Sequence, residues 1–163
     1  MKKIFVLIFL PLIFFSCSLD SFLFEPKVEE YSFSNEIIPV TNRSLIDFKV
    51  SDKTLYALQI RTTNTNNYIL YFHGNYRNLN HYYKWIEIYY EMGYNSFTID
   101  YEGFGQSEGS CSEEALFRDA DSAYDYVTKN LNWPEKKIII YGYSLGSIPA
   151  VYLSTKHKVK MLF

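Results

Sequence analysis

The sequence is poor in the residues from which disulfide frameworks and metal sites are built. Its 163 residues include two cysteines, Cys17 and Cys111, and three histidines. Because Cys17 belongs to the amino-terminal leader discussed below, only Cys111 would lie inside a folded domain, where a single thiol cannot form an internal disulfide. No cysteine–histidine cluster has the spacing of a metal site. We therefore expect a domain with no metal and no other cofactor, in which Cys111 is structural.

The sequence also lacks an excess of positive charge. Lysine and arginine together number 16 against 18 aspartates and glutamates, which gives a net charge of −2. A nucleic-acid-binding protein needs a basic face, so this balance argues against a nucleic-acid partner. Hydrophobic residues make up 48% of the chain and aromatic residues 19%, which predicts a packed core rather than disorder. The length fits one domain, and no internal repeat is present.

No apolar run reaches the length of about 20 residues that an ordinary membrane span needs. The longest run is residues 4–15, which follows Lys2 and Lys3 and is interrupted only by Pro11. This arrangement is typical of a signal peptide. A small residue stands directly before Cys17, and this resembles the lipobox of bacterial lipoproteins, in which the cysteine is acylated and becomes the mature amino terminus.

This resemblance implies a signal peptide at residues 1–16 and an exported protein, anchored to a membrane of the bacterial cell envelope through lipidated Cys17. The alternative is an ordinary signal peptide with an incidental cysteine, which would give a secreted or periplasmic protein. Residues 17–44 are expected to be a tether along the domain surface, because their apolar residues have no sustained period and two prolines interrupt them. Residues 45–163 then form the domain.

Short apolar runs alternate with helical patterns through that domain. Strands are expected at residues 45–50, 54–61, 68–72, 96–100, 137–141 and 159–163, and helices at 79–92, 112–130 and 147–156. A polar turn joins the first two strands, which predicts an antiparallel hairpin. The run at 68–72 is all-apolar, which is typical of a strand buried on both faces of a parallel sheet, and the later strands alternate with helices. A capping box of Ser110 and Glu113 is expected to start the second helix. The fold class is therefore α/β, with a mostly parallel sheet, an amino-terminal antiparallel hairpin and flanking helices.

Residues 142–146 have the pattern G-x-S-x-G between a buried strand and a helix. This pattern is typical of a nucleophile elbow, a sharp turn that presents the hydroxyl of Ser144. Gly142 and Gly146 would be needed because side chains at these positions would collide with the neighbouring strand and helix. The alternative is a glycine-rich turn in which Ser144 caps the following helix.

Two other unusual loops follow expected strands. One contains His73, Gly74 and Asn75, and the other is the glycine-rich loop at 101–109. Both loops and Ser144 fall at carboxyl ends of strands, where active sites of α/β sheets lie. The glycine spacing at 103, 105 and 109 is not that of a dinucleotide-binding loop. The His-Gly-Asn segment could also be a simple turn.

Together these motifs, H-G-N at 73–75, D-Y-x-G-F-G-x-S-x-G at 100–109 and G-Y-S-L-G-S at 142–147, resemble the α/β-hydrolase superfamily. The resemblance is strongest to its serine aminopeptidase-like and depalmitoylase-like branch, and covers the amino-terminal portion of such a domain. It implies that Ser144 is the catalytic nucleophile in ester, thioester or amide hydrolysis of a small acyl substrate. It also assigns the supporting residues: oxyanion-hole amides at Asn75 and Leu145, loop-shaping residues His73, Gly74, Gly142 and Gly146, and acyl-pocket residues Phe104 and Tyr143.

The triad acid and base that this resemblance requires are missing after Ser144. The family order is serine, then aspartate or glutamate, then histidine, but the 19 remaining residues contain no acidic residue and only His157. At about 1.5 Å per helical residue, His157 would lie about 20 Å from Ser144. The chain is therefore expected to be an incomplete α/β hydrolase, inactive alone, whose missing carboxy-terminal half is a partner. The alternative is a non-catalytic membrane-anchored lipoprotein that keeps a hydrolase remnant as a binding or structural module.

An incomplete sheet would also leave apolar surface exposed. We expect an unpaired edge at residues 159–163 and an uncovered apolar face on the helix at 147–156. Such surfaces predict that the isolated chain is unstable or self-associates.

Overall fold

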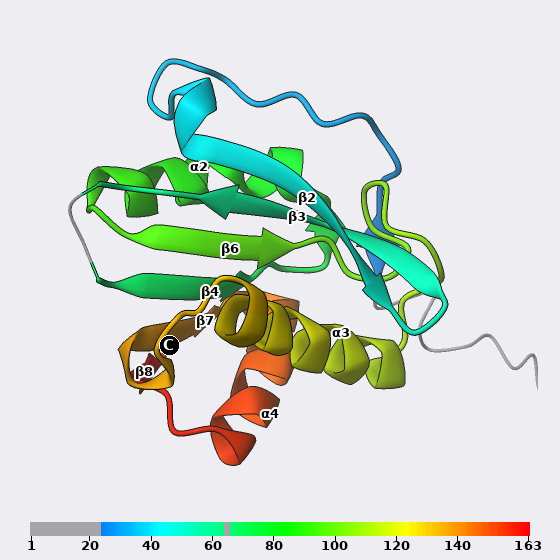
Figure 1. The fold of residues 1–163 in the computed structure, drawn as a ribbon. Coiled ribbons are helices and arrows are strands. Elements are labelled where there is room, and N and C mark those ends of the chain that lie inside the picture. The colour runs from blue at the N-terminus through cyan, green and yellow to red at the C-terminus, as the bar shows by residue number, and fades with distance from the viewer. Residues whose placement is uncertain (1–23, 64–65) are drawn as a thin grey trace, which may run out of the picture.

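The computed structural model describes residues 24–63 and 66–163, so the expected signal peptide and Cys17 lie outside the described residues. Its centre is a six-stranded sheet with the order β2-β3-β6-β4-β7-β8 (Figure 1). The strands are β2 Arg43–Val50, β3 Lys53–Ile60, β4 Tyr68–Phe72, β6 Asn95–Ile99, β7 Ile138–Gly142 and β8 Met161–Leu162. β3 runs antiparallel to β2 and β6, and the remaining pairs are parallel. The expected parallel sheet with an amino-terminal hairpin is confirmed.

Helices cover both faces of this sheet (Figure 1). Helix α2 (Leu79–Glu91) packs on one face, and α3 (Glu113–Asp125) and α4 (Ser147–Lys156) pack on the other. The side chains of β4 alternate between the two resulting cores: Leu70 and Phe72 face α3 and α4, and Ile69 and Tyr71 face α2. Burial on both faces explains why this strand is an uninterrupted apolar run.

Several element boundaries differ from those expected. The hairpin turn is one residue shorter, because Val50 pairs with Lys53 and Ser51 adopts a positive φ of 57°. The expected capping box is wrong: Ser112 caps α3 by accepting from the Ala115 amide at 3.1 Å. Ser110 still belongs to the preceding loop, where its Cα packs against Gly103.

The carboxy-terminal end of α3 also differs from the expected single helix. The α-helix ends at Asp125, and one π-helical turn, Tyr126–Asn130, completes the expected length. The buried face of the helix is as expected from its spacing. Its apolar residues are Ala115, Leu116, Ala120, Ala123, Tyr124 and Val127, and Asp119 is buried with them.

The described part of the expected tether packs closely on the domain. Strand β1 (Glu25–Pro26) pairs in parallel with β5 (Tyr76–Arg77), and the side chain of Ile38 is fully buried. β2 already begins at Arg43, inside the range assigned to the tether. We name residues 24–38 the strap, because they run across the domain as a fixed segment. The spacing of its apolar residues follows neither helical nor strand periodicity, because each of them is buried separately and not as part of one face of a helix or strand.

The sheet edge at β8 is exposed, as are parts of α4. Met161, Leu162 and Phe163 are exposed at this edge, and Ile148 and Val151 are exposed on α4. β8 is only two residues long, shorter than the strand expected at 159–163. Among the residues that the structure describes, no helix has both the length and the apolar character of a membrane span.

Candidate active site

Three neighbouring strands bring the loops singled out from the sequence to one edge of the sheet. β6, β4 and β7 are adjacent and parallel, so the loops that follow their carboxyl ends are also adjacent. These are the loop at 100–109 after β6, the loop at 73–78 after β4, and the turn at Ser144 after β7. An active site at this edge is what the strand order favours.

The turn at Ser144 is a strained elbow between β7 and α4. Ser144 has a φ of 53°, in the left-handed region that non-glycine residues seldom adopt, and its side chain is exposed. No side chain caps α4 or the short 3-10 turn before it. A capping serine would have extended backbone angles, so the alternative in which Ser144 is a helix cap is wrong.

The two glycines of the elbow occupy positions with no room for a side chain. A Cβ atom at Gly142 would lie 2.4 Å from the Gly146 carbonyl oxygen, and one at Gly146 would lie 2.0 Å from the Phe72 carbonyl oxygen. The Tyr143 amide also donates to the Phe72 carbonyl at 2.9 Å. The elbow is therefore packed backbone to backbone on the carboxyl end of β4.

This packing leaves the amino end of α4 suited to negative charge. Leu145 lies in the turn that opens the helix, and the Ser147 hydroxyl donates to the Ser144 carbonyl at 2.6 Å. The first amides of a helix have no intrahelical acceptor, and the helix dipole favours an anion there. The oxyanion role expected for the Leu145 amide fits this position, and that role stays a prediction.

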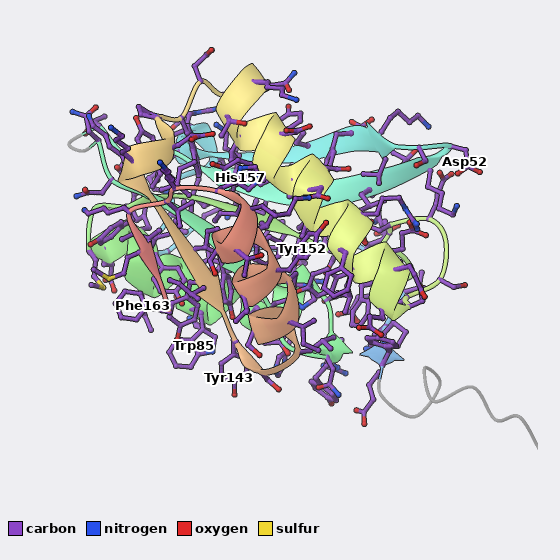
Figure 2. All side chains as sticks on the ribbon, turned by 90° about the horizontal axis from the view of Figure 1, so that it is seen from below. Asp52, Trp85, Tyr143, Tyr152, His157 and Phe163 are labelled. Atoms are coloured by element: carbon purple, nitrogen blue, oxygen red, sulfur yellow. The ribbon has the colours of Figure 1, made fainter. Side chains whose placement is uncertain are left out.

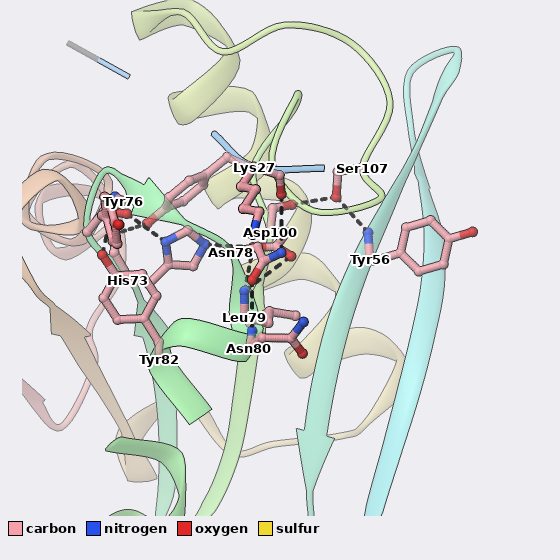
Figure 3. Close-up of polar contacts among 12 residues, drawn as sticks. Lys27, Tyr56, His73, Tyr76, Asn78, Leu79, Asn80, Tyr82, Asp100 and Ser107 are labelled. Atoms are coloured by element: carbon pink, nitrogen blue, oxygen red, sulfur yellow. Dashed lines mark hydrogen bonds and ion pairs between the residues drawn. The ribbon is translucent and has the colours of Figure 1, made fainter. Parts of the chain in front are cut away.

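His73 shapes the neighbouring loop from inside the protein. Its ring is fully buried, stacks on Tyr82 at 4.8 Å, and places Nε2 3.0 Å from Asp100 Oδ1 (Figure 3). Its Nδ1 lies 2.7 Å from the Gly74 carbonyl oxygen, to which it donates because a carbonyl oxygen can only accept. With both nitrogens engaged, this ring is not placed to serve Ser144 as a base.

Asp100 is the residue that the sequence analysis missed. Its buried carboxylate accepts from the Leu79 amide at 3.0 Å and from the Tyr31 hydroxyl at 2.7 Å, in addition to its contact with His73. It thereby joins the end of β6 to the start of α2, the strap and the His73 loop, and Figure 3 shows its contacts with His73 and Leu79. A Cβ atom at Gly105, which has a φ of 55°, would lie 2.1 Å from Asp100 Oδ2. The available signal was the position of Asp100 at the end of the strand expected at 96–100, directly before the glycine-rich loop.

The two residues expected in an acyl pocket differ in exposure. Phe104 is fully buried, 5.6 Å from the His73 ring centroid, so it supports His73 and offers no surface to a substrate. The expectation that it lines a pocket is therefore wrong in this structure. Tyr143 is 45% exposed and lies beside Gly74, with Trp85 on the same side of the molecule (Figure 2).

The glycine-rich loop is held by a second buried carboxylate, on α3. Asp119 Oδ2 accepts from the Glu102 amide at 2.8 Å, and Arg118 forms an ion pair with the buried Glu102 side chain. Burial raises the pKa of Asp119 to about 7. Asp119 Oδ1 has no hydrogen-bond partner among the described residues.

None of the chain's three histidines is placed as the base of a triad. His73 is engaged as above, and His81 is exposed on α2, edge-on to Tyr76. His157 follows the last residue of α4, where it stacks on Tyr124 at 3.8 Å, far from Tyr143 (Figure 2). Within residues 24–63 and 66–163, no group of three or more His, Cys, Asp or Glu side chains is arranged to bind a metal.

A helix-flanked parallel sheet with a serine on a strained strand-to-helix turn defines the α/β-hydrolase class. Comparison with known proteins agrees. The family model Hydrolase_4, described as serine aminopeptidase S33, matches residues 63–161. The chain belongs to this family.

Curated relatives extend well beyond the matched region. Protein bem46 of Schizosaccharomyces pombe is 31% identical over 134 residues, which are 82% of this chain and 44% of that protein. The α/β-hydrolase domain-containing protein aho-3 of Caenorhabditis elegans is 33% identical over 58% of this chain and 29% of its own length. The chain thus spans less than half the length of these relatives.

Solved structures give the same result for the fold. An α/β hydrolase of Vibrio vulnificus superposes with a TM-score of 0.63 at 25% identity, covering 74% of this chain and 44% of that one. An esterase of Pyrococcus furiosus superposes with a TM-score of 0.68 at 18% identity, covering 84% and 53%. The second likeness is evidence of fold alone.

Proposed function

We propose that this chain carries the nucleophile and oxyanion hole of a serine hydrolase that cleaves an ester, thioester or amide. The observation that carries the proposal is the elbow, where Ser144 adopts a φ of 53° between two glycines that admit no side chain. Such strain persists where the surroundings enforce it, and it is common at active sites. Ser144 is an exposed residue just after the end of β7, a position suited to contact with an acyl group.

The reaction would proceed through an acyl-serine. The Ser144 hydroxyl oxygen attacks the substrate carbonyl carbon and its proton passes to a general base. The negative charge that develops on the carbonyl oxygen is stabilised by the backbone amides of Asn75 and Leu145. The leaving group departs with a proton, and water then hydrolyses the acyl-serine. Tyr143, exposed beside Gly74, is suited to contact the acyl group.

The acid and base of this reaction would come from polypeptide outside these 163 residues. The three histidines of the chain are all engaged or placed elsewhere. The relatives contain more than twice the matched length, and the exposed β8 edge offers a place for further strands. The alternative, a binding or structural module without catalysis, is favoured by the same lack of a base. This makes the reactivity of Ser144 the deciding measurement.

The test is labelling with a fluorophosphonate probe, read by mass spectrometry. We would compare the 163-residue chain with the chain joined or mixed with polypeptide that supplies the triad aspartate and histidine. Rapid, single labelling at Ser144 in the second sample, lost in Ser144→Ala and kept in Ser147→Ala, is the expected result. No labelling in that sample would overturn the hydrolase proposal and support the non-catalytic alternative.

We also propose that Cys17 is lipidated and anchors the protein to a membrane. The apolar run at 4–15 and the small residue before Cys17 support this, and a similar yeast protein, 32% identical over 105 residues, is described as an uncharacterised membrane protein. Expression with an alkyne-bearing fatty acid should label the wild type and not Cys17→Ala. Equal labelling of both proteins would refute the anchor.

A further inference from the structure

We infer that the strap positions the oxyanion loop, with Tyr31 as the positioning residue. This inference rests on the proposed function, because it concerns how the Asn75 amide is aimed at the site. The strap holds both peptide groups that flank Asn75, one directly through its backbone and one through a relay of side chains that ends at Tyr31.

The first peptide group lies between Gly74 and Asn75 and carries the amide expected in the oxyanion hole. A trans peptide is planar, with its N–H pointing opposite to its carbonyl. The His73 ring holds the Gly74 carbonyl through Nδ1 at 2.7 Å, so the orientation of His73 sets the direction of the Asn75 N–H. Asp100 in turn holds the ring through Nε2 at 3.0 Å.

Tyr31 completes this relay from the strap. Its hydroxyl donates to Asp100 Oδ2 at 2.7 Å and accepts from the Gln106 amide at 3.2 Å (Figure 3 shows the Asp100 end of the relay). Burial, reinforced by the neighbouring carboxylate, raises the pKa of the Tyr31 hydroxyl, so it remains a donor. The Tyr31 ring is fixed between Phe33 at 5.8 Å and Tyr56 at 6.0 Å. Without this hydroxyl, one oxygen of Asp100 and one amide of the glycine-rich loop would lose a partner.

The second peptide group lies between Asn75 and Tyr76 and is held by the strap backbone. The Glu25 amide donates to the Asn75 carbonyl at 3.0 Å, and the Lys27 amide donates to the Arg77 carbonyl at 3.2 Å. The loop between these contacts is strained, because Arg77 has a φ of 64°. A strained loop needs such external contacts to keep one conformation.

Side-chain contacts fix the strap to the start of α2. The Asn78 side chain donates to the Lys27 carbonyl at 3.1 Å, and the Asn80 side chain donates to the Glu30 carbonyl at 2.8 Å. The Ser32 amide donates back to Asn80 Oδ1 at 2.9 Å. These contacts keep the strap in register with the loop, so it acts as a template for residues 75–78.

The test compares Tyr31→Phe with Tyr56→Phe. Both changes remove one hydroxyl from neighbouring rings, and the Tyr56 hydroxyl makes no hydrogen bond with the described residues. We would measure amide hydrogen exchange in the whole chain. Tyr31→Phe should speed exchange at Leu79 and Gln106 about 10-fold, because local opening loses a buried hydrogen bond. Exchange at Tyr143, whose amide bonds to Phe72, should change less than 2-fold, and Tyr56→Phe should alter none of these rates.

A second readout connects the loop to the reactive serine. In the polypeptide that contains the complete triad, Tyr31→Phe should lower the maximal rate of fluorophosphonate labelling, kinact, about 10-fold and leave KI unchanged. Uniformly faster exchange at all amides would overturn the inference in favour of general destabilisation, as would unchanged exchange at Leu79 and Gln106. If the wild type never reacts at Ser144, the proposed function fails, and the exchange data still decide whether the strap orders the loop.

Discussion

Two neighbouring loops at the candidate site, the elbow at Ser144 and the loop at 73–78, are held in place by different kinds of contact. The elbow at Ser144 is fixed by backbone packing, because Gly142 and Gly146 approach neighbouring carbonyl groups too closely for any side chain. The loop at 73–78 is fixed by side chains, through the buried contacts of His73 and Asp100. The partners of the elbow lie in β4 and α4, whereas the contacts that hold the other loop extend to the strap, where Tyr31 lies 69 residues before its partner Asp100 in sequence.

The comparison shows why one loop can tolerate almost no change while the other can be adjusted. Backbone packing has no freedom to relax, and each change in it should be costly. A hydrogen-bonded relay can lose one member and keep part of its geometry. The predictions below test this difference, from the largest expected effect to the smallest.

Gly146→Ala should be the most damaging single change. Gly146 has a φ of −62°, which alanine adopts readily, so the expected cost comes entirely from the clash of the new Cβ with the Phe72 carbonyl at 2.0 Å. We expect a loss of about 4 kcal/mol or more in the free energy of unfolding, at the extreme of overpacking effects. Denaturant titration measures it.

The matched control is Gly93→Ala. No atom lies within 4 Å of a Cβ at Gly93, but its φ is 81°, so this change carries only a backbone cost of about 1–2 kcal/mol. Equal losses in the two variants would show that the elbow is not held by close packing.

Asp100→Ala should cost slightly less, about 3 kcal/mol. The change leaves the Leu79 amide and the Tyr31 hydroxyl without their shared acceptor inside the protein and removes the partner of His73 Nε2. Leaving buried donors without an acceptor is among the costly polar changes. Asp47→Ala, at an exposed position on β2, should alter stability by less than about 0.5 kcal/mol. An Asp100→Ala protein as stable as this control would remove Asp100 from its central place in the loop.

The same contrast explains what the sequence could predict. The sequence pattern of the elbow lies within five consecutive residues and was therefore readable, and glycine at 142 and 146 indicated the close packing. The relay around His73 depends on Tyr31 and Asp100, and no local pattern connects them. The strap was predicted as a surface tether because its buried residues follow no period.

The mistaken details have similar causes. Phe104 was placed in an acyl pocket because it belongs to a loop near the site, but its side chain turns inward onto His73. The cap of α3 is Ser112 and not Ser110, because the backbone of Ser110 lies against Gly103 within the loop. In each case the outcome was decided by packing between segments that sequence patterns treat separately.

The glycine-rich loop at 101–109, which is held by the buried carboxyl group of Asp119, extends the comparison to a contact whose strength depends on pH. Between the usual aspartate pKa of about 4 and the raised value of about 7 for Asp119, the folded protein keeps a proton that the unfolded chain has released. The free energy of unfolding should therefore fall as pH rises from 4 to 7, and this contribution should be absent in Asp119→Asn. We expect the stability of the variant relative to the wild type to improve from pH 4 to pH 8 by a few kcal/mol, about 1.4 kcal/mol for each pKa unit of the shift.

Besides burial, the hydrogen bond from the Glu102 amide lowers the pKa of Asp119, as do Arg118 and Lys53, whereas the Glu102 carboxylate raises it. Stability would be measured by urea titration across this range. Asp47→Asn, the loss of one exposed carboxylate, is the control for general charge effects. Parallel pH profiles for wild type and Asp119→Asn would show that Asp119 ionises normally in the folded protein.

The smallest expected effect is a gain, and it tests whether the elbow stores strain for the sake of its serine. Ser144 has a φ of 53°, which glycine adopts without the cost that a Cβ brings. Ser144→Gly should therefore raise the free energy of unfolding by about 1 kcal/mol relative to Ser144→Ala, since both changes remove the hydroxyl and only one removes the strain.

Ser51 supplies a control at the β2–β3 turn, where φ is 57° and the chain is exposed, so the same pair of changes there should differ by a similar amount. A gain at position 51 without one at 144 would mean that the packing of Gly142 and Gly146 already compensates the left-handed serine. A gain at both would mean that stability is given up at the elbow to hold a hydroxyl in a position that glycine would occupy more favourably.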